Sequence, residues 1–153
     1  MDTKTSLSIL EVEMETFLRI PLVLCVSLHD EEKLLVGCVY RSPSSGTQNN
    51  EALNKLPRMI VNRQESHIII VGDFNFLGID WEVWYIGVTP QHPAHQFIET
   101  LLDIYFHQHV TETTRHRQGQ ELSILCLVIT NVNEMIKSRW NTEPHLEVVT
   151  IAA

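Results

Sequence analysis

The sequence predicts a layered α/β domain, because strand-like apolar runs alternate along the chain with segments of helical periodicity. The clearest strand is "HIIIVGDF", residues 67–74, an almost continuous apolar run of the kind that is buried on both faces. The clearest helix lies between Pro93 and Tyr105, where Phe97, Leu101 and Tyr105 recur on one helical face. A length of 153 residues suits one domain with a single core.

The other elements follow from the same kind of pattern. "IPLVLCVSLHDEEKLLVGCVYRSP", residues 20–43, predicts two strands joined by an acidic turn, and Pro43 ends the second strand. "NEALNKLPRMIVN", residues 50–62, predicts a helix. Pro57 lies in its middle and lacks a backbone N–H, so we expect a kink or break there at a cost of about 3 kcal/mol. "SILCLVIT", residues 123–130, predicts a further buried strand.

Composition restricts the possible functions and locations of the chain. The formal net charge is −8 at pH 7, and the only local basic cluster is "TRHRQG", residues 114–119. Proteins that hold nucleic acid by its phosphates usually have a basic stripe, although a bound metal ion supplies positive charge locally. No apolar run reaches the roughly 18 residues of a membrane span, and the N-terminal segment is unlike a signal peptide. We therefore expect an intracellular protein, nuclear or cytoplasmic, that is neither secreted nor membrane-bound.

The cysteines carry a separate expectation. Cys25, Cys38 and Cys126 are an odd number at wide spacing, each within an apolar segment. This pattern predicts reduced, buried thiols rather than a disulfide framework or a zinc site. Cys126 has no basic residue before it in its strand, so we interpret it as an inert core thiol rather than a nucleophile.

The stretch "IIIVGDFNFLGIDWE", residues 68–82, is the strongest candidate site. A buried strand delivers Asp73 and Asn75 to its exit, at a spacing that points both side chains the same way on a strand. A carboxylate there can bind Mg²⁺ or transfer a proton, and an amide can position an oxyanion. The pair suits metal-assisted attack of water on a phosphodiester. The alternative is that both are turn residues whose side chains bond nearby backbone.

An ordered series of segments surrounds this motif: "LLVGCVYRSPSS", a helix, "IIIVGDFN", and "HPAHQFIETLLDIYFHQHVTETTRHRQGQELSILCLVITN". The series resembles the endonuclease/exonuclease/phosphatase superfamily, and specifically the endonuclease domain of LINE-type (non-LTR) retrotransposons. The resemblance covers residues 20–135, with divergent segments at 1–19 and 136–153. It implies a layered sandwich of two β-sheets flanked by helices, here truncated and incomplete at both ends. It also implies hydrolysis of phosphodiester bonds in DNA with Mg²⁺ or Mn²⁺.

The resemblance assigns roles to three residues. Tyr40, at the exit of the strand before "RSP", matches the active-site tyrosine of the family. Asp73 matches the aspartate that activates water or protonates the leaving group, and Asn75 matches the asparagine that orients it. Asp73 and Asn75 are also the implied metal-binding residues. The alternative for Tyr40 is an ordinary aromatic residue at a strand end, with a packed ring and a hydrated hydroxyl.

Three departures from the family pattern affect this assignment. The family has a metal-binding glutamate upstream; Glu11, Glu13 and Glu15 are available, but their segment does not match and none is assigned. The family places an aspartate where this chain has Cys126, and that aspartate orients a histidine of a downstream Ser-Asp-His motif. The third departure is that this Ser-Asp-His motif is missing. His145 is the histidine nearest the C-terminus, and its surroundings, "EPHLE", do not match the motif.

These departures leave two functions open. The first is a metal-dependent endonuclease or phosphodiesterase, impaired because cooperating residues are missing. The second is a non-catalytic retrotransposon-derived remnant or binding module that uses the same site without turnover. The charge of −8 predicts weak DNA binding at best. The oligomeric state stays open.

Histidine and tryptophan residues outside the motif have both structural and functional interpretations. His107 and His109 alternate, but no cysteine or acid lies beside them at ligand spacing, so we predict polar surface and capping roles for the histidines, not a metal site. Trp81 and Trp84 could stack on bases. We favour packing of the loop that follows the motif onto the sheet.

Overall fold

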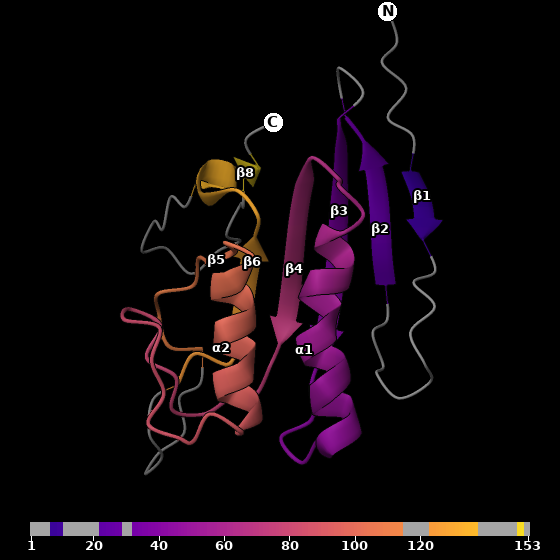
Figure 1. Cartoon of the computed structure of the whole chain (residues 1–153). Coiled ribbons are helices and arrows are strands. Elements are labelled where there is room, and N and C mark those ends of the chain that lie inside the picture. Colours follow the sequence, from indigo (N-terminus) through magenta and orange to yellow (C-terminus); the bar gives the residue numbers. More distant parts are fainter. Residues whose placement is uncertain (1–6, 11–21, 29–31, 115–122, 138–149, 152–153) are drawn as a thin grey trace, which may run out of the picture.

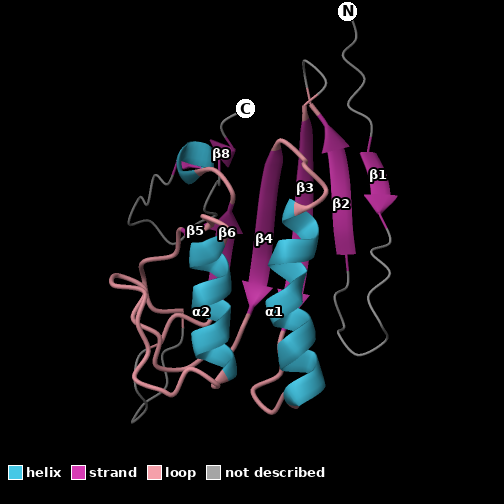
Figure 2. Cartoon of the chain, viewed as in Figure 1, coloured by secondary structure: helices cyan, strands magenta, loops and turns pink. Residues whose placement is uncertain are grey.

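The computed structural model describes residues 7–10, 22–28, 32–114, 123–137 and 150–151. These residues form a six-stranded mixed sheet with the order β1-β2-β3-β4-β6-β5, and a second sheet made of the pair β7–β8 (Figures 1 and 2). The strands of the large sheet are β1 (Leu7–Leu10), β2 (Leu22–Ser27), β3 (Lys33–Tyr40), β4 (His67–Asp73), β6 (Cys126–Thr130) and β5 (His107–Gln108). The short pair is β7 (Ile136–Lys137) and β8 (Thr150–Ile151), and a 3-10 turn, η2 (Asn133–Met135), precedes β7. The predicted α/β class is confirmed.

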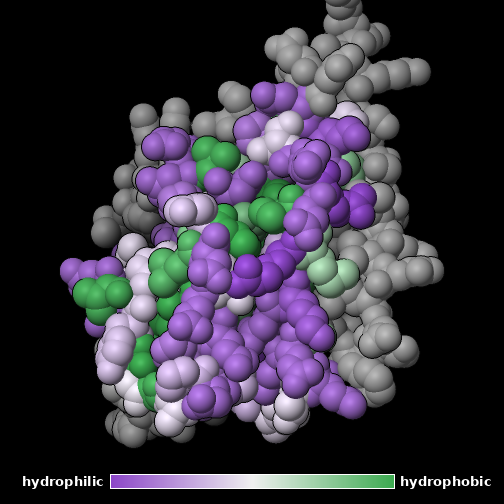
Figure 3. All heavy atoms as spheres, in the orientation of Figure 1, coloured by the Kyte–Doolittle hydropathy of each residue, from purple (hydrophilic) through white to green (hydrophobic). Residues whose placement is uncertain are grey.

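Strands β3 and β4 are parallel, whereas the other neighbouring pairs in the large sheet are antiparallel. Helix α1 (Thr47–Val61) connects β3 to β4, and helix α2 (Pro93–Asp103) connects β4 to β5. The two helices lie side by side on one face of the sheet (Figure 1). Their outer surface is predominantly hydrophilic, with hydrophobic side chains in smaller groups (Figure 3). Because α1 carries the chain back between two parallel strands, β3 and β4 end at the same edge of the sheet.

Side chains alternate between the two faces of the sheet along each strand, and each face carries its own apolar layer. One layer joins the sheet to the helices and contains buried residues from three strands and both helices: Leu35, Val39, Ile68, Ile70, Leu127, Ile129, Leu53, Leu56, Ile60, Phe97 and Leu101. The opposite face carries a smaller cluster around Leu34, Ile69 and Met135, against which Val71 and Val128 pack. Both faces of β4 are thus apolar, which explains why its sequence is a nearly continuous apolar run.

The structure corrects two details of the predicted helices. Helix α1 continues through Pro57 to its end, so the helix does not break there. Pro57 is buried beside Leu56 and Ile60, and packing of this face offsets the missing backbone donor. Helix α2 ends at Asp103, and Tyr105, expected on its buried face, is 82% exposed with a φ of 57°. The left-handed turn at Tyr105 places Phe106 in the core instead.

Gly72 of β4 has a backbone conformation that leaves no room for a side chain. Its φ is +152°, and a Cβ built on it would lie 1.8 Å from the backbone oxygen of Val39. That contact is with backbone, which has little freedom to move in the centre of a sheet. Only glycine therefore fits this position.

We predict that Gly72→Ala lowers the free energy of unfolding by about 3 kcal/mol, because β3 must move away from β4. Urea unfolding followed by circular dichroism measures this change. Gly37→Ala is the matched control, since a Cβ at Gly37 meets its nearest atom, in Ile70, at 3.9 Å. Equal urea midpoints for the two variants would contradict the prediction.

Candidate functional site

Tyr40, Asp73 and Cys126 lie in one row across the ends of three neighbouring strands. Tyr40 of β3 is paired with Asp73 of β4, and Asp73 is paired with Cys126 of β6. Directly paired residues project from the same face of a sheet. Val39 and Ile70 belong to the layer under the helices, so this row lies on the opposite face. The fold therefore brings Tyr40 and Asp73 together, and their chemical roles stay predictions.

Asp73 has a carboxylate oxygen that none of the described residues bonds. Its Oδ1 is buried and has no hydrogen-bond partner among the described residues. A buried acceptor in this state costs roughly 1–3 kcal/mol unless water or an ion satisfies it. Tyr40, beside it, is 54% exposed, so its hydroxyl can reach a molecule that approaches from solvent. The row thus combines an unsatisfied carboxylate oxygen with an accessible phenol.

Asn75 is fixed by the residue that follows Tyr40. Its Nδ2 donates to the backbone oxygen of Arg41 at 2.7 Å. Strand β4 ends at Asp73, and Asn75 has a φ of 49°, a conformation that asparagine tolerates better than most residues. Asn75 is therefore placed by a turn, not by the alternation of a strand. The turn interpretation is right in part, but the bond goes to the neighbouring strand exit, not to its own backbone.

Arg41 is the residue at this site that the sequence analysis did not identify. Its side chain is only 9% exposed. Nε donates to Oδ1 of Asn50 in α1 at 2.9 Å, and one terminal nitrogen donates to the backbone oxygens of Asn75 at 3.0 Å and Phe74 at 3.4 Å. Burial lowers the pKa of Arg41 from its ordinary value, although a guanidinium stays charged in proteins. The available signal was an arginine directly after a buried strand, in "VYRSP".

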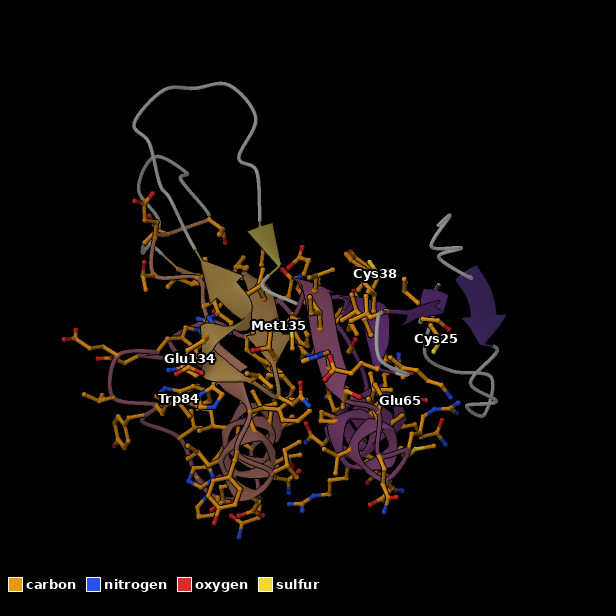
Figure 4. All side chains as sticks on the ribbon, turned by 90° about the horizontal axis from the view of Figure 1, so that it is seen from above. Cys25, Cys38, Glu65, Trp84, Glu134 and Met135 are labelled. Carbon is orange, nitrogen blue, oxygen red and sulfur yellow. The ribbon has the colours of Figure 1, made fainter. Side chains whose placement is uncertain are left out.

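The cysteines correct another prediction. Cys25 is buried as expected, but Cys38 and Cys126 are exposed. Both exposed residues are on the face opposite the helices, and Figure 4 shows Cys38 on that side of the sheet. The apolar cluster on this face is centred on Leu34 and Ile69, at the other end of β3 and β4, so it does not cover the residues near the strand exits.

The comparison with protein families decides the assignment. The profile of the family described as "Endonuclease-reverse transcriptase" (Exo_endo_phos_2) matches residues 34–147. This chain belongs to that family. The predicted membership of the endonuclease/exonuclease/phosphatase superfamily is confirmed. A search of curated protein sequences gave no significant match.

Two solved structures are similar to this chain. The endonuclease domain of TRAS1, a telomere-specific non-LTR retrotransposon, superposes with a TM-score of 0.54 at 14% identity, over 84% of this chain and 56% of that one. The 3′ phosphatase NExo from Neisseria, bound to a product DNA hairpin, gives a TM-score of 0.46 at 15% identity, over 86% and 65%. The chain thus spans little more than half of the TRAS1 domain, and that likeness shows the fold.

Members of this superfamily generally depend on divalent metal ions, so the oxygen atoms of the site are possible metal ligands. Asp73 and Asn75 offer the hard oxygen ligands that Mg²⁺ and Mn²⁺ prefer, and the unpartnered Oδ1 of Asp73 fits such a role. Among the described residues there is no group of three or more His, Cys, Asp or Glu that could hold a metal ion. Glu11, Glu13 and Glu15 lie outside the described residues, as does His145.

The loop after the motif packs onto the domain, as predicted for its tryptophans. Trp81 is buried in the core and Trp84 packs against it, with the rings edge to face and their centroids 5.3 Å apart. Phe76 joins the same layer through Phe97, with ring centroids 5.2 Å apart. The aromatic side chains of this family member therefore anchor the segment that leaves the site.

Among the described residues, two histidines have the capping and polar roles that were predicted. His92 accepts a hydrogen bond from the backbone N–H of Ala94 and caps α2. His109 lies 2.7 Å from the hydroxyl of Thr130, which itself donates to the backbone oxygen of Val132. Since that hydroxyl has a single proton, Nε2 of His109 is the donor to Thr130.

Within the described residues no helix is long and apolar enough to cross a membrane.

We predict that two of the three thiols react rapidly with a disulfide reagent in the folded protein, because Cys38 and Cys126 are exposed and Cys25 is buried. Absorbance of the released thiolate measures the number of reactive groups. Cys38→Ser and Cys126→Ser should each remove one rapid equivalent, and denaturant should release the third. A single rapid equivalent in the unaltered protein would contradict the exposure of this face.

We also predict a pH effect from His109. Burial and the neighbouring His107 lower its pKa from the ordinary value of 6.5. The unfolded chain therefore binds a proton while folded His109 is still neutral, so the free energy of unfolding decreases as the pH falls below about 6.5, until folded His109 also protonates. Urea unfolding above and below that pH measures this loss.

His109→Gln keeps an N–H donor for Thr130 and removes the titration. It should therefore lose less stability at low pH than the unaltered protein does. His95→Gln controls for the loss of a histidine as such. If the stability of His109→Gln and of the unaltered protein changes in parallel with pH, His109 does not contribute in this way.

Proposed function

We propose that this domain hydrolyses phosphodiester bonds in DNA with the help of Mg²⁺ or Mn²⁺, at the row formed by Tyr40 and Asp73. The observation that supports this most directly is the buried, unpartnered Oδ1 of Asp73 at the exit of a central strand, beside an exposed phenol. Membership of an endonuclease family supports the reaction class. DNA is proposed as the substrate from the same membership.

The residues of the site fit a metal of this type. Mg²⁺ is commonly held by one or two carboxylates, with water and substrate phosphates completing its coordination. Asp73 would supply the carboxylate, and Asn75 the amide oxygen, since its Nδ2 already donates to Arg41. When bound, the ion supplies charge stabilisation to the phosphoryl group and a more acidic water.

The chain's own groups would act on the reacting phosphate as follows. The Asp73 carboxylate accepts a proton from the attacking water or returns one to the leaving oxygen. The hydroxyl of Tyr40 donates a hydrogen bond to a non-bridging phosphate oxygen from the exposed side of the row. The register of the two strands brings the two residues together before substrate binds, so part of the cost of orienting them is met by folding.

A second candidate function is a module that binds phosphate groups without turnover. The specific observation in its favour is the thiol of Cys126 opposite Asp73, where the family resemblance places an aspartate. The described residues also lack a cluster of three metal-ligating side chains. In this case the strand exit would be an inherited platform whose chemistry has been lost.

We predict that the purified chain nicks supercoiled plasmid DNA only with Mg²⁺ or Mn²⁺, and that Asp73→Asn lowers the rate by roughly 100-fold or more, because a positioned acid or base contributes that much. Asp73→Asn preserves the size of the side chain and removes the charge. Asp103→Asn is the matched control: Asp103 is exposed at the end of α2 and paired with Arg58.

Nicking that persists in Asp73→Asn would refute the proposed role of Asp73. A folded wild-type protein without activity would support the binding module instead. Fluorescence anisotropy with a labelled oligonucleotide then distinguishes the module from an inert domain.

A further inference from the structure

We propose that Arg41 is a positioning residue, which holds the turn of residues 73–76 so that Asp73 and Asn75 face the reacting phosphate. The inference rests on the proposed function for its catalytic consequence, whereas the positioning itself rests on the geometry alone. Arg41 directly follows Tyr40 and is 9% exposed, so it acts through other residues and not on the substrate.

Arg41 contacts four consecutive residues of the turn. Its backbone N–H donates to the oxygen of Asp73 at 2.8 Å, and its backbone oxygen accepts from Nδ2 of Asn75 at 2.7 Å. Its guanidinium donates to the backbone oxygens of Phe74 and Asn75 and lies over the ring of Phe76, 4.2 Å from the centroid. Backbone, amide and cation–π contacts from one residue thus converge on one short segment.

The turn needs this support because strand pairing has ended. The register between β3 and β4 stops at the pair Tyr40–Asp73, and β4 itself ends at Asp73. The next residues include Asn75 in the left-handed region. A residue other than glycine in that region costs on the order of 1 kcal/mol, and it persists only where the surroundings determine it. The contacts of Arg41 contribute to that determination.

The guanidinium is itself held in one orientation. Its Nε donates to Oδ1 of Asn50, and Nδ2 of Asn50 donates to the backbone oxygen of Ser45 at 3.2 Å. Asn50 is buried in the first half of α1. Within the described residues no carboxylate forms an ion pair with Arg41, and all of its acceptors are neutral oxygens. The planar guanidinium therefore holds its N–H donors in fixed directions toward these oxygens, and a lysine ammonium does not reproduce this geometry.

The experiment compares Arg41→Met and Arg41→Lys with Arg58→Met. Methionine fills similar space without donors, and lysine keeps the charge without the fork. Arg58 is an exposed arginine of α1 paired with Asp103 at 2.6 Å, so its loss controls for the removal of a charged side chain. Each variant is assayed well below its own unfolding temperature, after circular dichroism has shown that it is folded.

Arg41→Met should lower kcat for plasmid nicking on the order of 100-fold, because displacement of reacting groups by about 1 Å has that effect. KM should change little, since Arg41 does not touch the substrate. Arg41→Lys should recover part of the loss, and Arg58→Met should match the unaltered protein. A kcat within twofold of the unaltered protein in a folded Arg41→Met would overturn the inference.

A second readout is independent of activity. In nitrogen-15 NMR spectra, the side-chain amide of Asn75 should be protected from solvent exchange in the unaltered protein. Arg41→Met keeps the backbone oxygen that accepts from this amide but removes the guanidinium contacts that hold the turn. Protection should therefore decrease, with shift changes concentrated in residues 73–76. Unchanged Asn75 resonances would overturn the inference even where kcat falls.

If the unaltered protein does not nick DNA, the proposed function fails and the NMR comparison alone decides whether Arg41 holds the turn. If Arg41→Met does not fold, Arg41→Lys replaces it in both measurements. The lysine variant should then show intermediate protection of the Asn75 amide. Full protection in Arg41→Lys would show that charge alone is sufficient and that the fork is not required.

Discussion

The parallel pairing of β3 and β4 is the constraint on which the site depends. Because α1 carries the chain back across the sheet, both strands end at one edge, and their register sets Tyr40 directly beside Asp73. Next to this pair, Gly72 has no room for a side chain, because a Cβ there would meet the backbone of Val39. A shift of one residue in this pairing would turn Asp73 toward the helices and away from Tyr40. The geometry of the site is therefore a property of the register.

The helix layer contributes to the same edge through Arg41. Strand pairing alone determines the chain as far as Asp73, and the following turn is held by contacts that run from α1 through Asn50 to Arg41. Phe76 and Phe97 then bind the far side of the turn to α2. The exit of β4 is thus attached to both helices. Preorganised catalysis or phosphate binding requires groups that are held in place in this way.

The sequence was sufficient to predict elements that depend on local pattern. The nearly continuous apolar run of β4, the helical stripe of α2 and the place of Asp73 at a strand exit all follow from periodicity and from residue type. Errors arose where tertiary packing decides the outcome. Pro57 stays helical because its helix is packed, and Tyr105 is exposed because the chain turns to bury Phe106.

Tertiary packing also explains why the exposed cysteines and the role of Arg41 were not predicted from the sequence. Whether a cysteine in an apolar strand is buried depends on what covers that face, and the pattern of the strand alone does not contain this information. Arg41 looks like a surface residue in the sequence, since charged side chains are rarely buried. Its role appears only when the exit of β3 and the exit of β4 are placed side by side. Long-range pairing, not local propensity, therefore determines which polar residues cooperate.

The thiol of Cys126 has a physical consequence for the proposed metal. A second carboxylate directly opposite Asp73 would bring two negative charges together across neighbouring strands, and that arrangement binds a divalent cation more strongly. With Cys126 in that position, the row carries one carboxylate and one thiol of little affinity for hard cations. A Mg²⁺ ion at Asp73 would then be held largely by water and by the phosphates of the substrate. Binding of metal and binding of nucleic acid would be mutually dependent, as linkage between two ligands requires.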